Sequence, residues 1–433
     1  MNLTLKGELA ERWPSWAGTE ARRNAANRKL RIYGEDYRAI LLAFIDESMG
    51  RGPVAEYIKR FATRSPNLLR ACTDSIAVAF QRGCTRELRG LGDGASKAFA
   101  AIVAESGIDR LQNGINARSW LQGPVLCAPH LDSRNRLAFD LANADAFDVV
   151  RDGDYIEQAL WFDRGTWIEL TPDAWNYWTA DGTLERSVPH AVGVCPAVAY
   201  TSIDNSGDYW SSSDHNGLVD ATLLVGYKAA AGLYVRQVSG NKITAIFADI
   251  EKLADGQSLG HPALPVILPP DARLELGDRI VPAKDYLDEI SAIITMAISA
   301  EGIPPGSVQM MANNADWGSL AIAVEGSRLG VLRDRQVPHL RAHEMALWPI
   351  VCDMVRGSQH RLKGKLPSGD ECRDALRVTF PDLASPKDTQ ERIAAMVAGL
   401  PYGLSSPADF LMAARPELTR AEVEEEMQSN LRV

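Results

Sequence analysis

The chain has 433 residues, of which 46% are hydrophobic and 24% are charged. These values are ordinary for folded globular chains and exclude a disordered, collagen-like or low-complexity protein. Lys and Arg number 46 against 56 for Asp and Glu, which gives a formal net charge of -10. Proteins that grip a nucleic-acid backbone usually carry a basic excess, so this charge disfavours tight, charge-driven nucleic-acid binding.

The cysteines are widely separated and form no C-x-x-C motif, which excludes a dense disulfide framework and disfavours a zinc site. They are Cys72, Cys84, Cys127, Cys195, Cys352 and Cys372. We expect reduced, mostly buried thiols. The segment Met1 to Lys6 lacks a signal-peptide pattern. The longest apolar runs, Thr222 to Val235 and Ala292 to Ala300, are too short or are broken by Lys228, because a membrane span needs about 20 apolar residues. The expectation is therefore a soluble, cytoplasmic protein with no membrane partner.

The amino-terminal third has helical periodicity up to about Trp120. Apolar residues at helical spacing predict a helix over Asp36 to Met49, and a further helix is expected from Ala95 to Glu105. Ser65 and Pro66 are predicted to cap and begin a helix between these two. The apolar stripe expected to follow that cap is Leu69, Cys72, Ile76, Ala79 and Phe80.

From Pro124 to about Tyr200 the pattern changes to short runs that favour β-strands. Residues 158–162 and 166–170 are two such runs, and Asp163-Arg-Gly165 between them is typical of a turn. An antiparallel meander is predicted. The tryptophans of this region are interpreted as packing residues in the core or a subunit interface. They are Trp161, Trp167, Trp175 and Trp178.

Two helices are predicted around a short segment rich in proline. The first covers Asn216 to Val238, with Asp214 as its cap, and the second covers Pro282 to about Ala300. Between them, prolines in 261–270 exclude both a helix and a central strand, which predicts a small extended unit. The segment 302–317 is rich in Gly, Pro and Asn and is predicted to be a long loop.

A long helical pattern follows, from Gly318 to about Gln359, and Pro338 and Pro349 are expected to kink it. After 364–369, the run 375–380 is predicted to be a strand. Three short helices are then expected, with start signals at Ser385-Pro386, Ser406-Pro407 and Thr419-Arg-Ala-Glu422.

Few patterns indicate catalysis. His339 and His343 lie four residues apart on a helical pattern, a spacing that can chelate zinc, but the H-E-x-x-H motif is not matched. A structural histidine pair is the favoured interpretation, and a metal-dependent hydrolase built on this pair is kept as an alternative. The glycines of Gly90 to Lys97 lack the spacing of a phosphate loop, and no hydrophobic strand is predicted before them. No G-x-S-x-G elbow is present, so no enzymatic activity and no cofactor are predicted.

The order of elements, together with three local phrases, resembles the portal proteins of tailed double-stranded DNA bacteriophages and related prophage elements. The first phrase is His190 to Val198, H-A-V-G-V-C-P-A-V, similar to the segment ahead of the first stem helix in that family. The second is Ile298 to Pro304, similar to the end of the second stem helix. The third is Gly403 to Thr419, similar to the family's tail. The resemblance covers the chain from about Asp36.

The resemblance implies an α+β portal-like subunit with a two-helix stem and a small α/β clip. The implied parts are a wing over 1–215, stem helices over 216–238 and 282–301, a clip over 239–281, a tunnel loop over 302–317, a long wing helix over 318–363 and a crown over 364–433. In the tunnel loop, the implied DNA-facing residues are Gln309, Met310, Met311, Asn313 and Asn314. In the clip, the implied terminase-facing residues are His261, Pro262, Pro265, Pro269 and Pro270.

The function that the resemblance implies is a dodecameric ring at one capsid vertex, assembled in the host cytoplasm, through which the genome is packaged and ejected. The implied partners are the large terminase, the major capsid and scaffolding proteins, a head-tail adaptor, and double-stranded DNA that passes without sequence specificity. An acidic subunit with a sparsely charged loop suits such weak contact with DNA. Another ring-forming head-tail adaptor is the remaining alternative.

Overall fold

The computed structural model describes residues 3–62, 65–81, 83–153, 155–202, 210, 215–240, 245–247, 266–268, 283–303, 319–381 and 408. The fold class is α+β, as predicted. By its internal contacts the chain divides into two units. The first combines Met1–Asn314 with Val331–Pro381, and the second combines Ala315–Gly330 with Asp382–Val433. The features below belong to the first unit, except that the beginning of the long helix, 319–330, belongs to the second.

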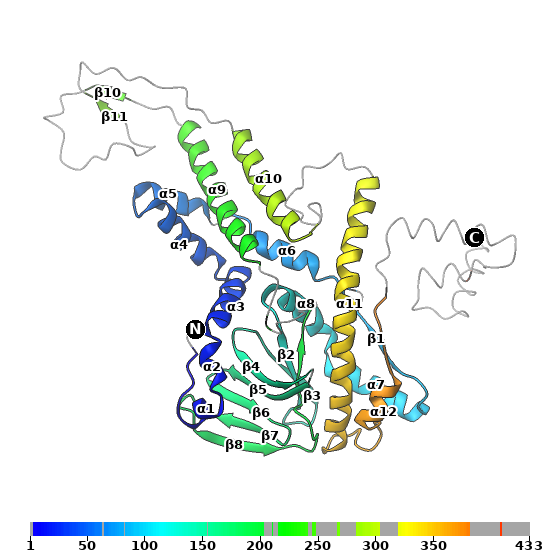
Figure 1. Ribbon diagram of the computed structural model, residues 1–433. Coiled ribbons are helices and arrows are strands. Elements are labelled where there is room, and N and C mark those ends of the chain that lie inside the picture. Colours follow the sequence, from blue (N-terminus) through cyan, green and yellow to red (C-terminus); the bar gives the residue numbers. More distant parts are fainter. Residues whose placement is uncertain are drawn as a thin grey trace. The chain divides into compact units, whose positions relative to one another are not determined.

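The amino-terminal third is mainly helical, as expected (Figure 1). Helices α4 and α7 confirm the two helices predicted at these positions, whereas the bounds of the three helices before α4 were not predicted individually. The helices are α1 (Gly7–Arg12), α2 (Ser15–Gly18), α3 (Glu20–Tyr33), α4 (Tyr37–Met49), α5 (Pro53–Phe61), α6 (Leu68–Ile76), α7 (Asp93–Ser106) and α8 (Asp109–Gln122).

The start of α6 differs from the prediction. Asn67, not Ser65, is its N-cap, and the Asn67 side chain accepts a hydrogen bond of 3.0 Å from the backbone N–H of Arg70. The Ser65 hydroxyl is used elsewhere, because it donates to the carbonyl of Gly226 at 2.9 Å. The helix ends at Ile76, so the predicted stripe is wrong in its last two positions, Ala79 and Phe80, which are buried in the turn beyond the helix.

A short strand, β1 (Thr85–Leu88), precedes the glycines at Gly90 and Gly92, although no hydrophobic strand was predicted there. It pairs antiparallel with β12 (Leu376–Thr379), which confirms the predicted strand over 375–380. The sequence does not indicate this strand as a hydrophobic run, because alternate residues of β1 are polar and exposed. Only the other face of the strand is buried.

The predicted meander is a five-stranded antiparallel sheet in sequential order. Its strands are β4 (Phe147–Asp152), β5 (Tyr155–Asp163), β6 (Thr166–Leu170), β7 (Ala174–Trp178) and β8 (Leu184–Pro189). The predicted turn joins β5 to β6: Asp163 pairs with Thr166, and the two residues between have φ of 47° at Arg164 and 93° at Gly165. Positive φ at both positions is the geometry that suits a tight hairpin, and glycine adopts it without strain.

A second sheet has the order β3-β2-β9, with all pairs antiparallel. Its strands are β2 (Val125–Leu131), β3 (Leu137–Ala142) and β9 (Val198–Tyr200). All four tryptophans of the meander are buried, which confirms their predicted packing role. Trp161 and Trp175 join a cluster with residues of β2 and β9, whereas Trp167 and Trp178 join one with Trp13 and other residues of α1 and α2. The amino-terminal helices therefore cover one face of the five-stranded sheet.

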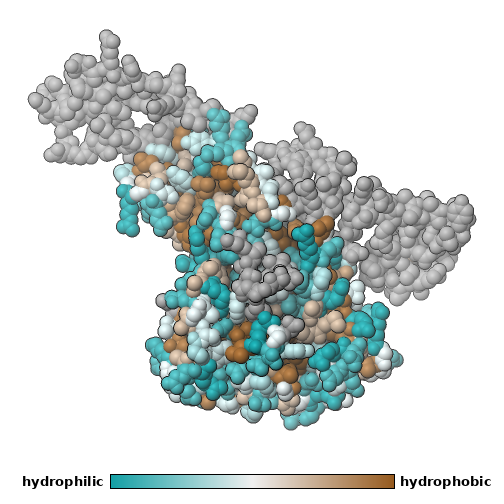
Figure 2. All heavy atoms as spheres, viewed as in Figure 1, coloured by the Kyte–Doolittle hydropathy of each residue, from teal (hydrophilic) through white to brown (hydrophobic). Residues whose placement is uncertain are grey.

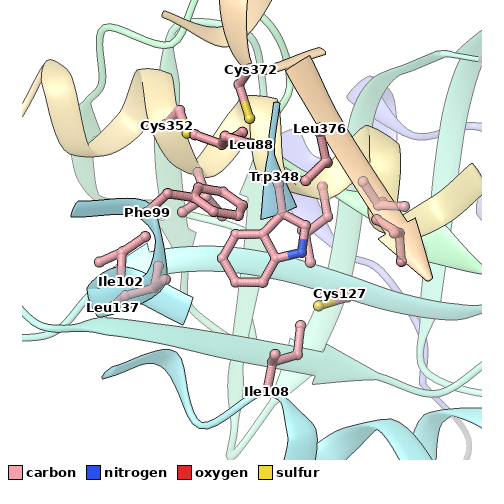
Figure 3. Packing of buried hydrophobic residues seen from close by; sticks show 14 of the residues in the cluster. Leu88, Phe99, Ile102, Ile108, Cys127, Leu137, Trp348, Cys352, Cys372 and Leu376 are labelled. Atoms are coloured by element: carbon pink, nitrogen blue, oxygen red, sulfur yellow. The ribbon is translucent and has the colours of Figure 1, made fainter. Parts of the chain in front are cut away.

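The largest core lies around Trp348 of α11 (Ser319–Arg356), where Phe99 of α7 and Leu376 of β12 meet it (Figure 3). Helix α11 confirms the predicted long helix and is one continuous element through Pro338 and Pro349. It is followed by α12 (Gly369–Ala375), which was not predicted. A capping box between Ser368 and Glu371 begins α12, and its S-x-x-E spacing is a signal that the sequence carried.

The two helices predicted around the proline-rich segment are α9 (Asn216–Gly240) and α10 (Ala283–Ala300). Between them, β10 (Ala245–Phe247) and β11 (Val266–Leu268) pair in parallel. The predicted cap Asp214 and the helix starts at 385, 406 and 419 lie outside the described residues.

Among the described residues, one helical run, Asn216–Gln237, is long and apolar enough to cross a membrane, with a mean hydropathy of 1.3. The prediction that no apolar run is long enough to cross a membrane is therefore wrong with respect to length. The helical run extends beyond the apolar stretch Thr222 to Val235 at both ends. Length and composition alone are weak evidence for a membrane span, and α9 packs against α4, α5, α6 and α10.

Candidate functional site: the α9/α10 helix pair and its base

Helices α9 and α10 form an antiparallel pair, here called the helix pair, that lies side by side in Figure 1. Three contacts fix its register. His215 meets Glu301 at 2.7 Å, Lys228 meets Glu289 at 2.6 Å, and Gly232 faces the ring of Tyr286. The residue number in α9 increases from one contact to the next while the residue number in α10 decreases. The two helices therefore run in opposite directions.

The inner side of α9 approaches α4 closely at Gly226. A Cβ at this position would lie 2.6 Å from the Tyr37 hydroxyl and 3.0 Å from the Leu41 methyl groups. The Gly226 carbonyl also accepts the hydrogen bond from Ser65. Glycine is therefore required here by close approach of the helices rather than by a special φ.

The helix pair exposes large apolar side chains. Leu287 is 63% exposed and Met296 is 66% exposed on α10, and Leu233 on α9 is 40% exposed. Figure 2 shows apolar residues distributed over this part of the surface. Isolated exposed apolar residues are normal on a soluble protein, but here three of them lie on one helix pair. The face of α10 that carries Met296, opposite the buried Ile294, is thus a candidate contact surface.

The base of the helix pair, defined here as Trp120, His215 and Glu301, joins three helices. His215 immediately precedes α9, Glu301 immediately follows α10, and Trp120 lies near the end of α8. The His215 side chain is buried, with Nδ1 2.7 Å from Oε2 of Glu301 and Nε2 2.8 Å from the carbonyl oxygen of Trp120. The imidazole also stacks on the Trp120 indole, with ring centroids 3.9 Å apart and an interplanar angle of 34°.

The predicted histidine pair on α11 does not form a metal site with the residues described. Nε2 of His343 accepts a hydrogen bond of 3.0 Å from the backbone N–H of Thr201, so its lone pair is already used. Burial, helped by the nearby His339, lowers the pKa of His343 to about 4, which keeps the ring neutral near pH 7. Over the described part of the chain, no three His, Cys, Asp or Glu side chains gather as a metal ion would need.

The other site residues inferred from the sequence cannot be placed. Gln309, Met310, Met311, Asn313 and Asn314 lie outside the described residues. So do the residues implied to face the terminase, which are His261, Pro262, Pro265, Pro269 and Pro270. Both sets remain predictions.

The described cysteines are free thiols, and all are buried except the half-buried Cys84. This confirms the expectation of reduced, mostly buried thiols. Burial raises the pKa of Cys72 in α6 to about 12, with a further contribution from the negative charge of Glu301.

No protein-family model and no curated protein matches the chain. Among solved structures, the chain is similar to one in the "Neck of empty GTA particle computed with C6 symmetry", with 13% identity and a TM-score of 0.43 over 83% of this chain and 92% of that chain. It is also similar to one in the "Neck of native GTA particle computed with C12 symmetry", with 13% identity and a TM-score of 0.41 over 86% of this chain and 91% of that chain.

A third similar chain is in the "Virion of native gene transfer agent (GTA) particle", with 12% identity and a TM-score of 0.40 over 83% of this chain and 92% of that chain. TM-scores this low indicate a loose likeness.

Sequence reasoning missed the base of the helix pair. His215 belongs to a polar loop, and Glu301 belongs to a phrase that was read only as a helix end. The signal that could have found them is positional: a histidine just before one apolar helix and a glutamate just after its partner meet if the two helices pair antiparallel.

Proposed function

We propose that this chain is a portal subunit of a tailed double-stranded DNA bacteriophage or related prophage element. Twelve copies would form a ring at one capsid vertex for packaging and ejection of the genome. The observation that carries the proposal is the antiparallel helix pair between the β-rich part of the chain and the long helix α11. It matches the order of wing, stem and long wing helix implied by the local phrases.

Two of the phrases flank the helix pair. His190 to Val198 ends at the start of β9, the last strand before α9, and Ile298 to Pro304 begins in the last turn of α10. In the proposal, α9 and α10 are the stem, and the segment between them, which includes β10 and β11, is the clip that meets the large terminase. The segment 302–317 is the tunnel loop.

Ring assembly gives a role to the face of α10 that carries Met296. A second copy packed there would remove Met296 from water, and burial of apolar area stabilises association by roughly 25 cal/mol per Å². The acidic residues Asp285 and Asp288 on the same helix are exposed and would repel phosphates, which suits a channel along which DNA slides.

The test is negative-stain electron microscopy of the purified protein, with light scattering for the mass. We expect rotationally symmetric rings with a central channel wide enough for a duplex. Met296→Asp should dissociate the rings, whereas the control Tyr155→Asp, at a hairpin tip where Tyr155 is 77% exposed, should leave them intact. A chain that stays monomeric at high concentration, even with scaffolding and capsid partners, would refute the proposal.

The ring-forming head-tail adaptor makes the same prediction about rings but not about the terminase. Deleting Gly260 to Pro270 separates the two functions. For a portal subunit, the deletion should leave rings intact and abolish binding of the large terminase that the unaltered ring shows. An unaltered ring that never binds the terminase would favour the adaptor.

A further inference from the structure

We infer that, in the ring, the face of α10 that carries Met296, here the Met296 face, packs against a different apolar site on the next copy. That site, here the leucine site, is formed by Leu233 of α9 and Leu287 of α10. The inference rests on the proposed function and deepens it, because it names the two unlike surfaces that meet between neighbouring copies of this chain.

Both leucines continue the buried side of the helix pair. Leu233 is seven positions, or about two turns, beyond Gly226, where a Cβ would lie 3.0 Å from the Leu41 methyl groups of α4. Leu287 is likewise about two turns before Ile294 of α10, which is buried in the hydrophobic cluster that also contains Leu41. Each leucine therefore lies on the side of its helix that is buried further along.

The two leucines also lie at the same level of the helix pair. Gly232 faces the ring of Tyr286, and Leu233 and Leu287 are the next residues in the two helices. Both leucines are exposed, whereas Ala230, one turn earlier in α9, is fully buried. The apolar side of the pair thus extends past the helices that cover it, and its last part is open to a partner.

The Met296 face lies on the opposite side of the helix pair. Leu287 and Met296 are nine positions apart, which is about two and a half turns, so their side chains point in opposite directions. The stretch 290–300 contains no Asp, Glu, Lys or Arg, although the solvent-facing side of a surface helix normally carries charge. Apart from Met296, its exposed residues are all small: Ser291, Ala292, Ser299 and Ala300. Another protein surface can therefore approach α10 closely here.

Two apolar surfaces on opposite sides of one element suit a closed ring. Each copy in a ring uses two different surfaces, one for each neighbour, and the same contact repeats around the ring. The stretch 229–235 around Leu233 is also free of charged residues, so no charge is buried when the two surfaces meet. A second copy would cover both surfaces, whereas a cover for the leucine site from within the same chain would leave Met296 in water.

The positions of the two surfaces constrain how the helix pair lies in the ring. Leu287 and Met296 are about 13 Å apart along the axis of α10. A rotation about the ring axis does not change the height of a residue. Met296 of one copy therefore reaches Leu287 of the next copy only if the helix pairs are inclined to the ring axis.

Thiol cross-linking of assembled rings of the full chain tests the contact. In the double variant Leu287→Cys/Met296→Cys, a short bismaleimide should join neighbours and give a ladder of covalent multimers in denaturing electrophoresis. Each single variant should give no ladder, because its introduced thiols then face leucine or methionine. The matched control Tyr155→Cys/Met296→Cys should also give none, since Tyr155 is exposed at a hairpin tip away from the helix pair. Rings of the double variant that give no ladder would overturn the inference.

A charge exchange decides the question if the cysteine variants do not assemble. Leu287→Glu and Met296→Lys should each cause loss of rings in light scattering and electron microscopy, because each places one charge in an apolar contact. The two changes combined should restore the rings, since opposite charges then meet, whereas Tyr155→Glu combined with Met296→Lys should not. A combined variant that stays dissociated would overturn the inference. If the unaltered chain forms no rings, the proposed function fails as well, whereas rings without this contact refute the inference alone.

Discussion

Nε of Arg86 donates to Oε2 of Glu344 at 2.7 Å, in an ion pair whose two side chains are 1% and 0% exposed. Glu344 also accepts hydrogen bonds from Gln112, from the Tyr200 hydroxyl at 3.1 Å and from the Trp348 indole at 2.9 Å. Burial opposes the charge of Arg86, but Glu344 outweighs it, and the pKa of Arg86 is raised. One carboxylate therefore joins β1, α8, β9 and α11.

Glu344→Ala should destabilise the protein by about 3–5 kcal/mol, because Nε of the buried Arg86, the Tyr200 hydroxyl and the Trp348 indole all lose their acceptor, and Asp109 is then the remaining ion-pair partner of Arg86. Asp370→Ala, which removes only the exposed pair with Arg373, should cost less than about 0.5 kcal/mol. Urea unfolding followed by circular dichroism measures both. Equal losses in the two variants would show that the buried carboxylate has no special role.

Gly226 and Gly232 of α9 should respond oppositely to alanine. Gly226→Ala should destabilise by about 1–3 kcal/mol, because the new methyl group would meet Tyr37 and Leu41. At Gly232, the nearest atom to a Cβ is 3.4 Å away on Tyr286, so Gly232→Ala should stabilise by up to about 1 kcal/mol through helix propensity. Thermal unfolding compares the two variants directly. A gain from Gly226→Ala would contradict the close packing of α9 on α4.

Acid should weaken the protein through His343. Its pKa is lowered from 6.5 to about 4, chiefly by burial and also by His339, so its contribution to folding is complete above about pH 6.5 and falls as pH decreases towards 4. The loss is at most about 3 kcal/mol. In His343→Gln, an amide oxygen can accept from Thr201 without titrating. As the pH is lowered from about 7 to about 4, the unfolding free energy of the wild type should therefore fall more than that of His343→Gln.

Trp13 anchors the amino-terminal helices to the five-stranded sheet. Its indole donates to Oε1 of the buried Glu169 at 3.0 Å, and its ring packs with Trp167 and Trp178. Trp13→Ala should cost about 3–5 kcal/mol, because it leaves both a cavity and a missing donor. Glu11→Ala, at an exposed position of α1, should stay within about 0.5 kcal/mol. Near-ultraviolet circular dichroism and urea unfolding test the pair.

The sequence by itself determined the local structure. Helical spacing from Asp36 to Met49, the Asp163-Arg-Gly165 turn and the apolar pattern of α9 and α10 reflect preferences of neighbouring residues, and such preferences act over a few positions. A prediction was wrong where two neighbouring residues could serve as the N-cap of the same helix. Ser65 and Asn67 are both good caps, and the contact of Ser65 with Gly226 left the cap to Asn67.

Tertiary structure decided the buried polar contacts. Arg86 and Glu344 lie 258 positions apart, and His215 and Glu301 lie 86 positions apart, so no local pattern could pair them. Whether a glutamate is a solvated surface residue, the centre of a buried network or the partner of a buried histidine depends on which helices meet around it. That meeting is fixed by the burial of apolar faces over the whole chain, because apolar burial is non-directional and sums over all elements at once.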